Sequence, residues 1–247
     1  MPPTDLLDGT LDLPPGFDLI TLRESGDAFA HAQKIAAQAG AGTVVHVGRF
    51  DLAEFAVVLE PDEPLRTARR ALYAGCVALA DALAASAPPE RPIDIVWPDT
   101  IRVDGGIVGG VQLAWPADAD EEAVPDWLVF GAMIRTVALG EHAPGLRPLG
   151  AALEEEGFAD VGSGRLVEGF TRHLMATIDN WQEQGFAAIA KNYLTRLARE
   201  GGVRRQVDEN GDLLVLHASK PEPQRCALLP ALARAAWRDP ATGGPRQ

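Results

Sequence analysis

Hydrophobic and polar residues follow two different spacings along the first 137 residues of the chain. Apolar residues at helical spacing predict helices at residues 28–39 and 65–85, the first of them after the capping side chains of Ser25-Gly26-Asp27. Short runs of high β-propensity predict strands at residues 17–22, 43–47, 54–59 and 127–137. The last of these strands is apolar almost throughout, which indicates burial on both of its faces.

Helical spacing dominates the second half of the chain. Gly185 separates two predicted helices, and the second of them is expected to end near Gly201-Gly202. The Asn210-Gly211 pair between two β-rich runs is the strongest hairpin signal of the sequence, and a short helix is predicted at residues 228–237. The first of the two long helices carries one apolar stripe, formed by Val167, Phe170, Leu174, Ile178 and Trp181.

Together these elements predict an α+β fold, with helices packed on a mostly antiparallel sheet. Prolines punctuate residues 1–16, which we expect to form a mobile leader. The main domain is expected at residues 17–200, followed by a small module of a β-hairpin and a helix at residues 201–247.

Residues 94–115, DIVWPDTIRVDGGIVGGVQLAW, are predicted to form strand, turn and strand, with Asp104-Gly105-Gly106 at the turn. The Trp97-Pro98 corner presents a large flat side chain, and Pro98 fixes the backbone beside it. Gly109-Gly110 on the returning strand lets a ligand approach the bare backbone closely. A buried tryptophan beside a bulge accounts for the same residues, so the pattern leaves a ligand site and a packed core both open.

The charge and the cysteines of the chain narrow its function class. A formal net charge of −13 argues against nucleic-acid binding and against docking on an anionic membrane, because both rely on lysine and arginine. Cys76 and Cys226 are too few for a disulfide framework and fit a reducing, cytoplasmic compartment, and no secretory signal is recognisable. The apolar run at residues 71–87 contains Asp81 and is shorter than the ~20 residues that span a bilayer.

The sequence offers little support for metal or nucleophilic chemistry. The five histidines are scattered without the spacing of metal ligands, so no metal site is expected. Cys76 lies in an apolar helical segment with no nearby cation to lower its pKa, which is typical of an inert packed thiol. No G-x-S-x-G motif is present.

At residues 94–115 the chain resembles the biotin–protein ligase and lipoate–protein ligase family. The Lys-Trp-Pro-Asn-Asp segment of that family corresponds here to residues 96–100, VWPDT, and its Lys-x-x-Gly segment corresponds to residues 107–110, IVGG. The resemblance continues on both sides and covers residues 17–217. Ser25 occupies the serine position at the head of the first helix, and Gly131-Ala132 matches the family's Gly-Ala-Gly-Ile-Asn strand.

The resemblance implies an enzyme that activates a vitamin carboxylate with ATP and Mg²⁺ and transfers the acyl group to an acceptor lysine. It therefore implies biotin, lipoate or a related organic acid as substrate, and a biotinyl or lipoyl acceptor domain as partner. The ligand-binding positions that it implies are Ser25, His46, Trp97, Pro98, Asp99, Gly109, Gly110, Gly131 and Ala132.

The chain departs from the family where charge is needed. The motif lysine is replaced by Val96 and the return-strand lysine position by Ile107, and the long glycine- and arginine-rich loop is shortened to HVGRFD, residues 46–51. Adenylation brings a carboxylate to a phosphate, so a cation must lie between them. Arg49 and Arg135 are the candidates for catalytic charge substitutes, Arg135 because it shares strand parity with the family's glycine position.

Three hypotheses follow from these residues. The first is a ligase of the biotin or lipoate type with a rearranged site, and the second is a ligase-derived binding protein that has lost the chemistry. The third is a related acyltransferase using the Cys76 thiol, whose helical setting argues against it. An exposed edge of the sheet would be compatible with a homodimer in each case.

Overall fold

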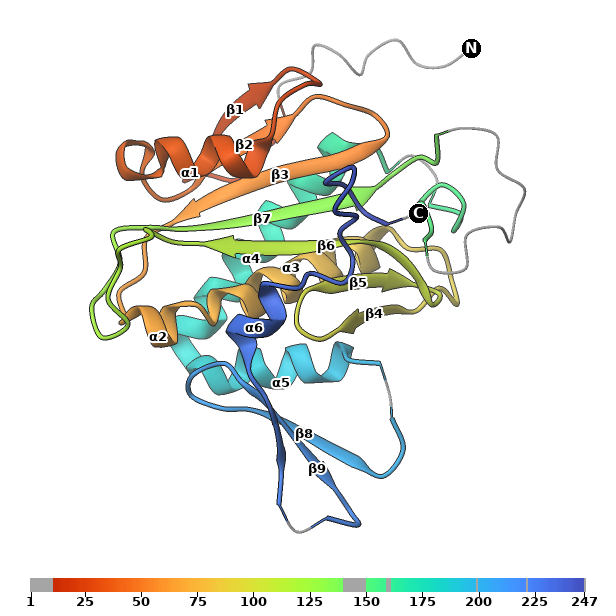
Figure 1. The fold of residues 1–247 in the computed structure, drawn as a ribbon. Helices are drawn as coiled ribbons and strands as arrows, with labels where there is room; N and C mark the ends of the chain where they lie inside the picture. The colour runs from red at the N-terminus through yellow and green to blue at the C-terminus, as the bar shows by residue number, and fades with distance from the viewer. Residues whose placement is uncertain (1–10, 140–149, 159–160, 199, 221, 247) are drawn as a thin grey trace.

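The computed structural model describes residues 11–139, 150–158, 161–198, 200–220 and 222–246, so most of the expected leader lies outside the described residues. The described chain is built on a seven-stranded sheet of order β1-β2-β3-β7-β6-β5-β4 (Figure 1). All neighbouring strands are antiparallel except β1 and β2, which are parallel. The strands are β1 (Asp18–Leu22), β2 (Thr43–Val47), β3 (Leu52–Leu59), β4 (Ile93–Val96), β5 (Thr100–Val103), β6 (Gly106–Ala114) and β7 (Leu128–Arg135).

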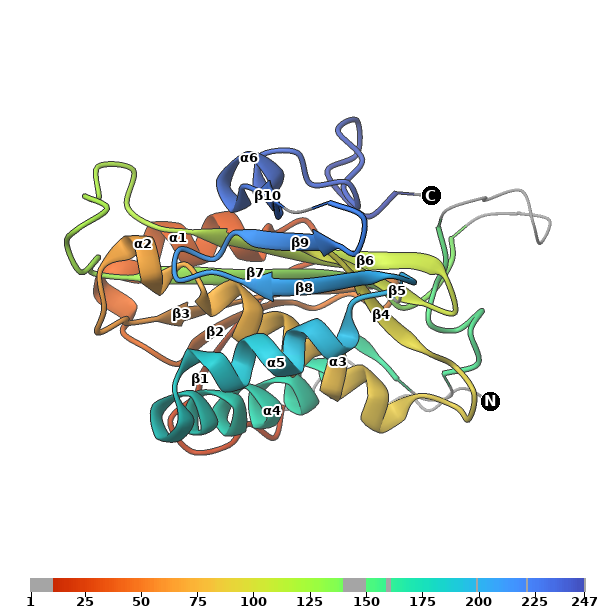
Figure 2. The same ribbon diagram turned by 90° about the horizontal axis from the view of Figure 1, so that it is seen from below.

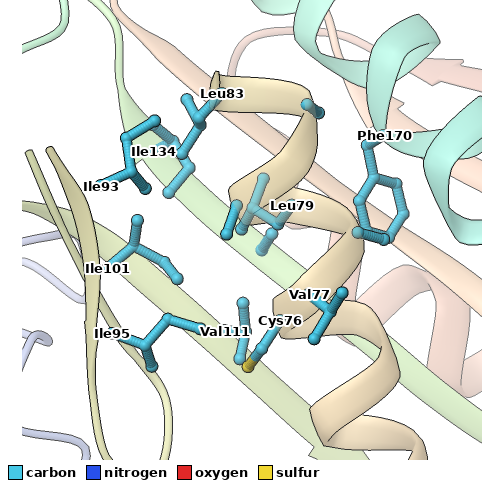
Figure 3. Close-up of a cluster of buried hydrophobic side chains, with 14 of the residues drawn as sticks. Cys76, Val77, Leu79, Leu83, Ile93, Ile95, Ile101, Val111, Ile134 and Phe170 are labelled. Atoms are coloured by element: carbon cyan, nitrogen blue, oxygen red, sulfur yellow. The ribbon is translucent and has the colours of Figure 1, made fainter. Parts of the chain in front are cut away.

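Three helices cover one face of this sheet: α3 (Ala71–Ser86), α4 (Ser163–Gln184) and α5 (Phe186–Arg196). Figure 2 shows them as a layer on one side of the strands. Helix α3 packs against the sheet and against both other helices, and it is accordingly apolar on nearly all sides and almost completely buried. Figure 3 shows Cys76 and Leu79 of α3 facing Ile95, Ile101 and Val111 of the sheet. This side forms the main hydrophobic core.

The opposite face of the sheet has a different cover. Helix α1 (Ala28–Ala39) packs on β2, β3 and β7 through its small residues Ala28, Ala32 and Ala36. Asp27 caps α1, since its side chain accepts a hydrogen bond from the Ala30 backbone N–H at 2.8 Å. The last residues of the chain lie over β6 and its neighbours on this face (Figures 1 and 2).

The predicted C-terminal module contains a second sheet of three strands, in the order β10-β9-β8, and a short helix. Its elements are β8 (Val203–Val207), β9 (Leu213–His217), β10 (Gln224–Cys226) and α6 (Leu228–Leu232). Leu213 and Leu228 belong to the main core, and the Tyr73 hydroxyl donates to the Gly211 carbonyl. The module therefore packs directly on α3, and the division of the chain at residue 200 stays a prediction.

The elements predicted from the sequence are confirmed with several differences. The helix expected to end near Gly201-Gly202 ends at Arg196. The helix expected at 65–85 is divided into α2 (Leu65–Ala68) and α3. The segment at 94–115 forms three strands, because the cis Trp97-Pro98 corner already reverses the chain between β4 and β5. The helix expected at 228–237 ends at Leu232, and the apolar residues after it pack on the sheet instead. Within the described residues, no helix has both the length and the hydropathy needed to cross a membrane.

Candidate functional site

On the face of the sheet opposite α3, strands β6 and β7 each carry a glycine, Gly110 and Gly131, so the backbone is bare at these two positions. Gly110 pairs with Met133, and Gln112 pairs with Gly131, so alternate residues of both strands share this face. A Cβ atom at Gly131 would lie 2.5 Å from the ring of Phe29 on α1. Since real side chains do not approach so closely, glycine is needed there for Phe29 to lie flat on the strand.

Gly110 is covered by an aromatic side chain from the end of the chain. A Cβ atom at Gly110 would lie 2.3 Å from Cδ1 of Trp237, whose indole is completely buried. Trp237 packs with Leu52 and Met133 in a small cluster, which Ile107 borders. The sequence leaves room for a ligand against the bare backbone at Gly110. In the structure, the Trp237 indole of the chain itself lies there.

The segment that carries this indole, residues 233–246, is here named the C-terminal strap. Besides the packing of Trp237, two hydrogen bonds attach the strap to the sheet: Nη2 of Arg135 donates to the Pro245 carbonyl at 2.6 Å, and Nη1 of Arg238 donates to Oε1 of Gln112 at 2.8 Å. Two further hydrogen bonds fold the strap onto itself. Nε of Arg238 donates to the Gly243 carbonyl, and the Arg246 backbone N–H donates to the Trp237 carbonyl, both at 2.7 Å.

A cavity of about 490 Å³ lies between the strap and the sheet. This volume is within the range of small-molecule sites, which runs from about 300 to 1,000 Å³. On the side of the sheet the cavity is lined by Phe29, Asp99, Val111, Gln112, Leu113 and Leu232. The side chains of Val111 and Leu113 pack against the main core. The cover of the cavity is formed by Ala233, Arg234, Ala235, Arg238, Pro240 and Arg246 of the strap.

Asp99 is a buried carboxyl group at the edge of this cavity, with only 2% of its surface exposed. Oδ1 accepts a hydrogen bond from the Thr100 hydroxyl at 3.2 Å, whereas Oδ2 has no hydrogen-bond partner among the described residues. Burial raises the pKa of Asp99 to about 7, although Thr100 and the nearby Trp237 indole oppose the rise. The carboxyl group therefore changes its charge near neutral pH.

The Trp97 indole lies away from the cavity, on the side of the helices. Its N–H donates to the Tyr73 hydroxyl at 3.1 Å, and the ring packs against the main core. The Pro98 carbonyl accepts a hydrogen bond from the Tyr193 hydroxyl at 2.9 Å. The corner of Trp97 and Pro98 is thus anchored to α3 and α5, and of the VWPDT segment it is Asp99 that lines the cavity.

Gly109 has a structural role in the β6–β7 pairing. Its φ is +155°, and a Cβ atom would lie 1.9 Å from the backbone oxygen of Met133. Strand β6 is bulged here against β5, next to Ile101 and Arg102. The close approach of the β7 backbone, and not a ligand, therefore requires glycine at this position.

The two arginines predicted as charge substitutes both bond to groups of the protein. Arg49 forms a two-point ion pair with Asp51, at 2.8 Å from Nε and 2.7 Å from Nη2, and this pair raises the pKa of Arg49. Arg135 is buried beneath the strap and bonds to Pro245. Neither arginine is among the residues that line the cavity.

The remaining predicted residues are spread around the sheet. Ser25 is exposed in the loop before α1, where Asp27 provides the cap. His46 pairs with Phe55, whose ring lies in the core under the helices, and burial lowers the pKa of His46. Ala132 also faces that core, whereas its neighbour Gly131 faces Phe29.

Sequence reasoning missed the strap as part of the site. Two signals were present: Trp237 is followed by the helix-breaking residues Asp239-Pro240 and Gly243-Gly244, and three arginines occur within residues 233–246 of a chain with a net charge of −13. Neither signal says which face of a distant sheet the segment covers.

Comparison with known proteins identifies the family of this chain. A family model described as the biotin/lipoate A/B protein ligase family matches residues 13–195, well over half of the chain. The chain belongs to this family. In this biotin/lipoate ligase family member, Ile107 packs in the Trp237 cluster and Val96 lies on edge strand β4 with 36% of its surface exposed. Comparison with curated proteins gave no match.

Solved structures of the family have the same fold. A biotin protein ligase-like protein of unknown function from a Silicibacter species is 29% identical, with a TM-score of 0.75 over 89% of this chain and 97% of the other. A biotin protein ligase variant from Aquifex aeolicus in complex with biotin is 16% identical, with a TM-score of 0.64 over 86% and 96%. The Leishmania major enzyme with biotinyl-5-AMP is 13% identical, with a TM-score of 0.52 over 87% and 99%.

Proposed function

We propose that this member of the biotin/lipoate ligase family binds a small carboxylic acid of the biotin, lipoate or acyl type in the cavity beneath the strap, without adenylating it. The observation that carries the proposal is the state of Arg49. It is the one arginine of the shortened loop at residues 46–51, and Asp51 holds it in a two-point ion pair. Its charge is therefore already neutralised by a neighbour.

The acid class is supported by the fold and by the size of the cavity. Structures of the same fold from Aquifex aeolicus and Leishmania major are complexes with biotin, with biotin and ATP, and with biotinyl-5-AMP. The cavity combines apolar side chains, from Phe29 and Leu232, with polar groups from the strap. Such a lining suits a ligand with an apolar body and one charged end.

Two charged positions of the family carry no cation in this chain. Val96 and Ile107 replace the two lysines, so neither strand offers a cation to a phosphate there. Losing an ion–phosphate contact removes about 3 kcal/mol or more of transition-state stabilisation, and each 1.4 kcal/mol or so slows the reaction tenfold. Adenylation is therefore not part of the proposed function, and a carrier domain of the acceptor type is proposed only as a partner that presents the bound acid.

Calorimetry together with an exchange assay tests this proposal. Purified protein is titrated with biotin, lipoate and octanoate, with and without ATP and Mg²⁺, and each mixture is assayed for exchange of labelled pyrophosphate into ATP. We expect one acid to bind with 1:1 stoichiometry, unaffected by ATP, and no exchange. Exchange with any acid would establish a working ligase instead, and failure of every acid to bind would overturn the acid-binding function itself.

A further inference from the structure

The lining of the cavity beneath the strap has an unusual charge for this protein. The whole chain carries a net charge of −13, yet three of the residues lining this one cavity are arginines: Arg234, Arg238 and Arg246. Asp99 is the one carboxyl group in the lining. A concave site with cations on one wall and apolar residues on the other concentrates anions locally, because the apolar wall keeps the dielectric constant low.

The fold of the strap brings these arginines together. The Asp239 backbone N–H donates to the Gly244 carbonyl and the Gly243 N–H donates to the Asp239 carbonyl, both at 2.8 Å, so the chain turns back on itself. A β-bridge between Arg238 and Pro245 then places residue 246 beside Trp237. Residues eight positions apart in the sequence consequently line the same cavity.

Arg238 is fixed while it lines the cavity. Gln112 of β6 accepts from Nη1, and the Gly243 carbonyl accepts from Nε. Both acceptors are neutral amide oxygens, so the guanidinium charge is oriented but has no carboxylate partner in these two bonds. A guanidinium held in this way is preorganised to bind the oxygens of a carboxylate or a phosphate group.

Asp99 is the buried carboxyl group among the residues that line this cavity. Its Oδ2 atom is itself buried, and the Trp237 indole of the strap lies close enough to oppose the rise in the pKa of Asp99. Buried polar oxygens in proteins are nearly always hydrogen-bonded, to protein, water or ligand. Asp99 is therefore held beside the strap's own indole, and the arginines are the groups of this cavity that can bind a ligand anion.

We propose that Arg234, Arg238 and Arg246 of the C-terminal strap form the binding site for the anionic end of the ligand, a carboxylate or a phosphate group. The family's two lysine positions are Val96 and Ile107 in this chain, and neither of them lines this cavity, so its positive charge comes from the arginines of the strap. That the ligand is a carboxylic acid rests on the proposed function. The anion site itself can be tested independently of it.

The test compares variants of the full chain by calorimetry. The probes are octanoate and biotin as carboxylates, octanamide as the neutral counterpart of octanoate, and inorganic pyrophosphate as the phosphate source. The variants are Arg238→Gln, Arg238→Lys and a matched control, Arg172→Gln, at an exposed arginine of α4 that bonds to Asp12. Thermal melting of each variant establishes that it is folded at the titration temperature.

We expect Arg238→Gln to raise the Kd of the bound anion roughly tenfold or more, because it removes a charge-assisted hydrogen bond. Arg238→Lys should recover part of the loss, Arg172→Gln should match the wild type, and octanamide should bind weakly and equally to all variants. Carboxylate binding that Arg238→Gln leaves unchanged would overturn the anion site and leave the proposed function standing. Arg238-dependent binding of pyrophosphate alone would support the anion site and overturn the carboxylic acid function, and absence of binding by every probe would overturn both.

Discussion

The two faces of the seven-stranded sheet are covered in different ways. On one face, α3, α4 and α5 bury a continuous apolar layer in which the Phe170 ring stacks on Phe130 and packs at an angle against Phe55. On the other face, α1 covers only part of the strands, and the strap covers the rest with one indole, several arginines and many glycine and proline residues.

This difference indicates that one face of the sheet mainly stabilises the fold and the other mainly binds a ligand. The helical face holds the fold together through close packing of its apolar side chains. The strap face contains the cavity, a buried carboxyl group and the charged side chains, and its cover is attached through a few hydrogen bonds at the very end of the chain. We infer that the first face determines whether the chain folds and the second determines what it binds. The following predictions test this division.

The largest loss of stability is expected from Phe170→Ala, a substitution on the helical face. The Phe170 ring is fully buried, with its centroid 4.7 Å from that of Phe55 and 5.5 Å from that of Phe130. Its removal should lower the free energy of unfolding by about 3–5 kcal/mol, as for other buried aromatic residues. Denaturant unfolding measures this change. The control is Phe50→Ala, at a side chain that is 63% exposed, and a similar loss in both variants would contradict the account.

A smaller effect is expected from Trp237→Ala, although this indole is equally buried. The strap can detach from the sheet while the helical core stays folded, so the loss is limited to about 2–3 kcal/mol, below the full cost of deleting a core aromatic side chain. Limited proteolysis should cut residues 233–246 first. Cooperative unfolding of the whole chain, with no early cleavage in the strap, would show that the two faces are one unit.

Asp99→Asn should change the pH dependence of stability. The folded pKa of Asp99, about 7, is above its ordinary value of 3.8, so the folded state holds its proton more tightly than the unfolded state does. Stability should therefore fall as the pH rises from about 4 to about 7, and stay low above that. The variant, which keeps an oxygen for Thr100, should be clearly more stable than the wild type at pH 8 and equal to it near pH 4. Parallel curves for the two proteins from pH 4 to 8 would refute the prediction.

The smallest change, both in stability and in ligand affinity, is expected from Arg49→Gln. The ion pair with Asp51 is partly exposed, and such pairs contribute less than about 1 kcal/mol. Because Arg49 lies outside the cavity, the affinity for octanoate or biotin should not change in calorimetry. A clear loss of affinity would instead place Arg49 in the ligand site, as the sequence alone suggested.

The sequence predicted the helical face well because the spacing of apolar residues within one helix or strand shows which of its sides is buried. The stripe from Val167 to Trp181, the break at Gly185 and the apolar strand β7 each follow from spacing within one element. The resemblance at residues 94–115 also identified the family and located Gly110 and Asp99, which do border the strap or its cavity.

The strap face could not be predicted because its partners are far apart in the sequence. Gly110 and Trp237 are 127 positions apart, and no local pattern connects them. The same is true of Gln112 and Arg238, whose hydrogen bond exists only when the end of the chain lies on β6. The orientation of the Trp97 indole toward Tyr73 was equally hidden, because strand parity does not hold through a corner that reverses the chain.

Hydrogen exchange of the free protein and of the protein saturated with its bound acid tests the central claim most directly. The account predicts slower exchange of backbone amides in β6 and in residues 233–246 when the acid is bound, and little change in α3, α4 and α5. Protection confined to the helical layer, with the strap exchanging at the same rate in both states, would contradict it.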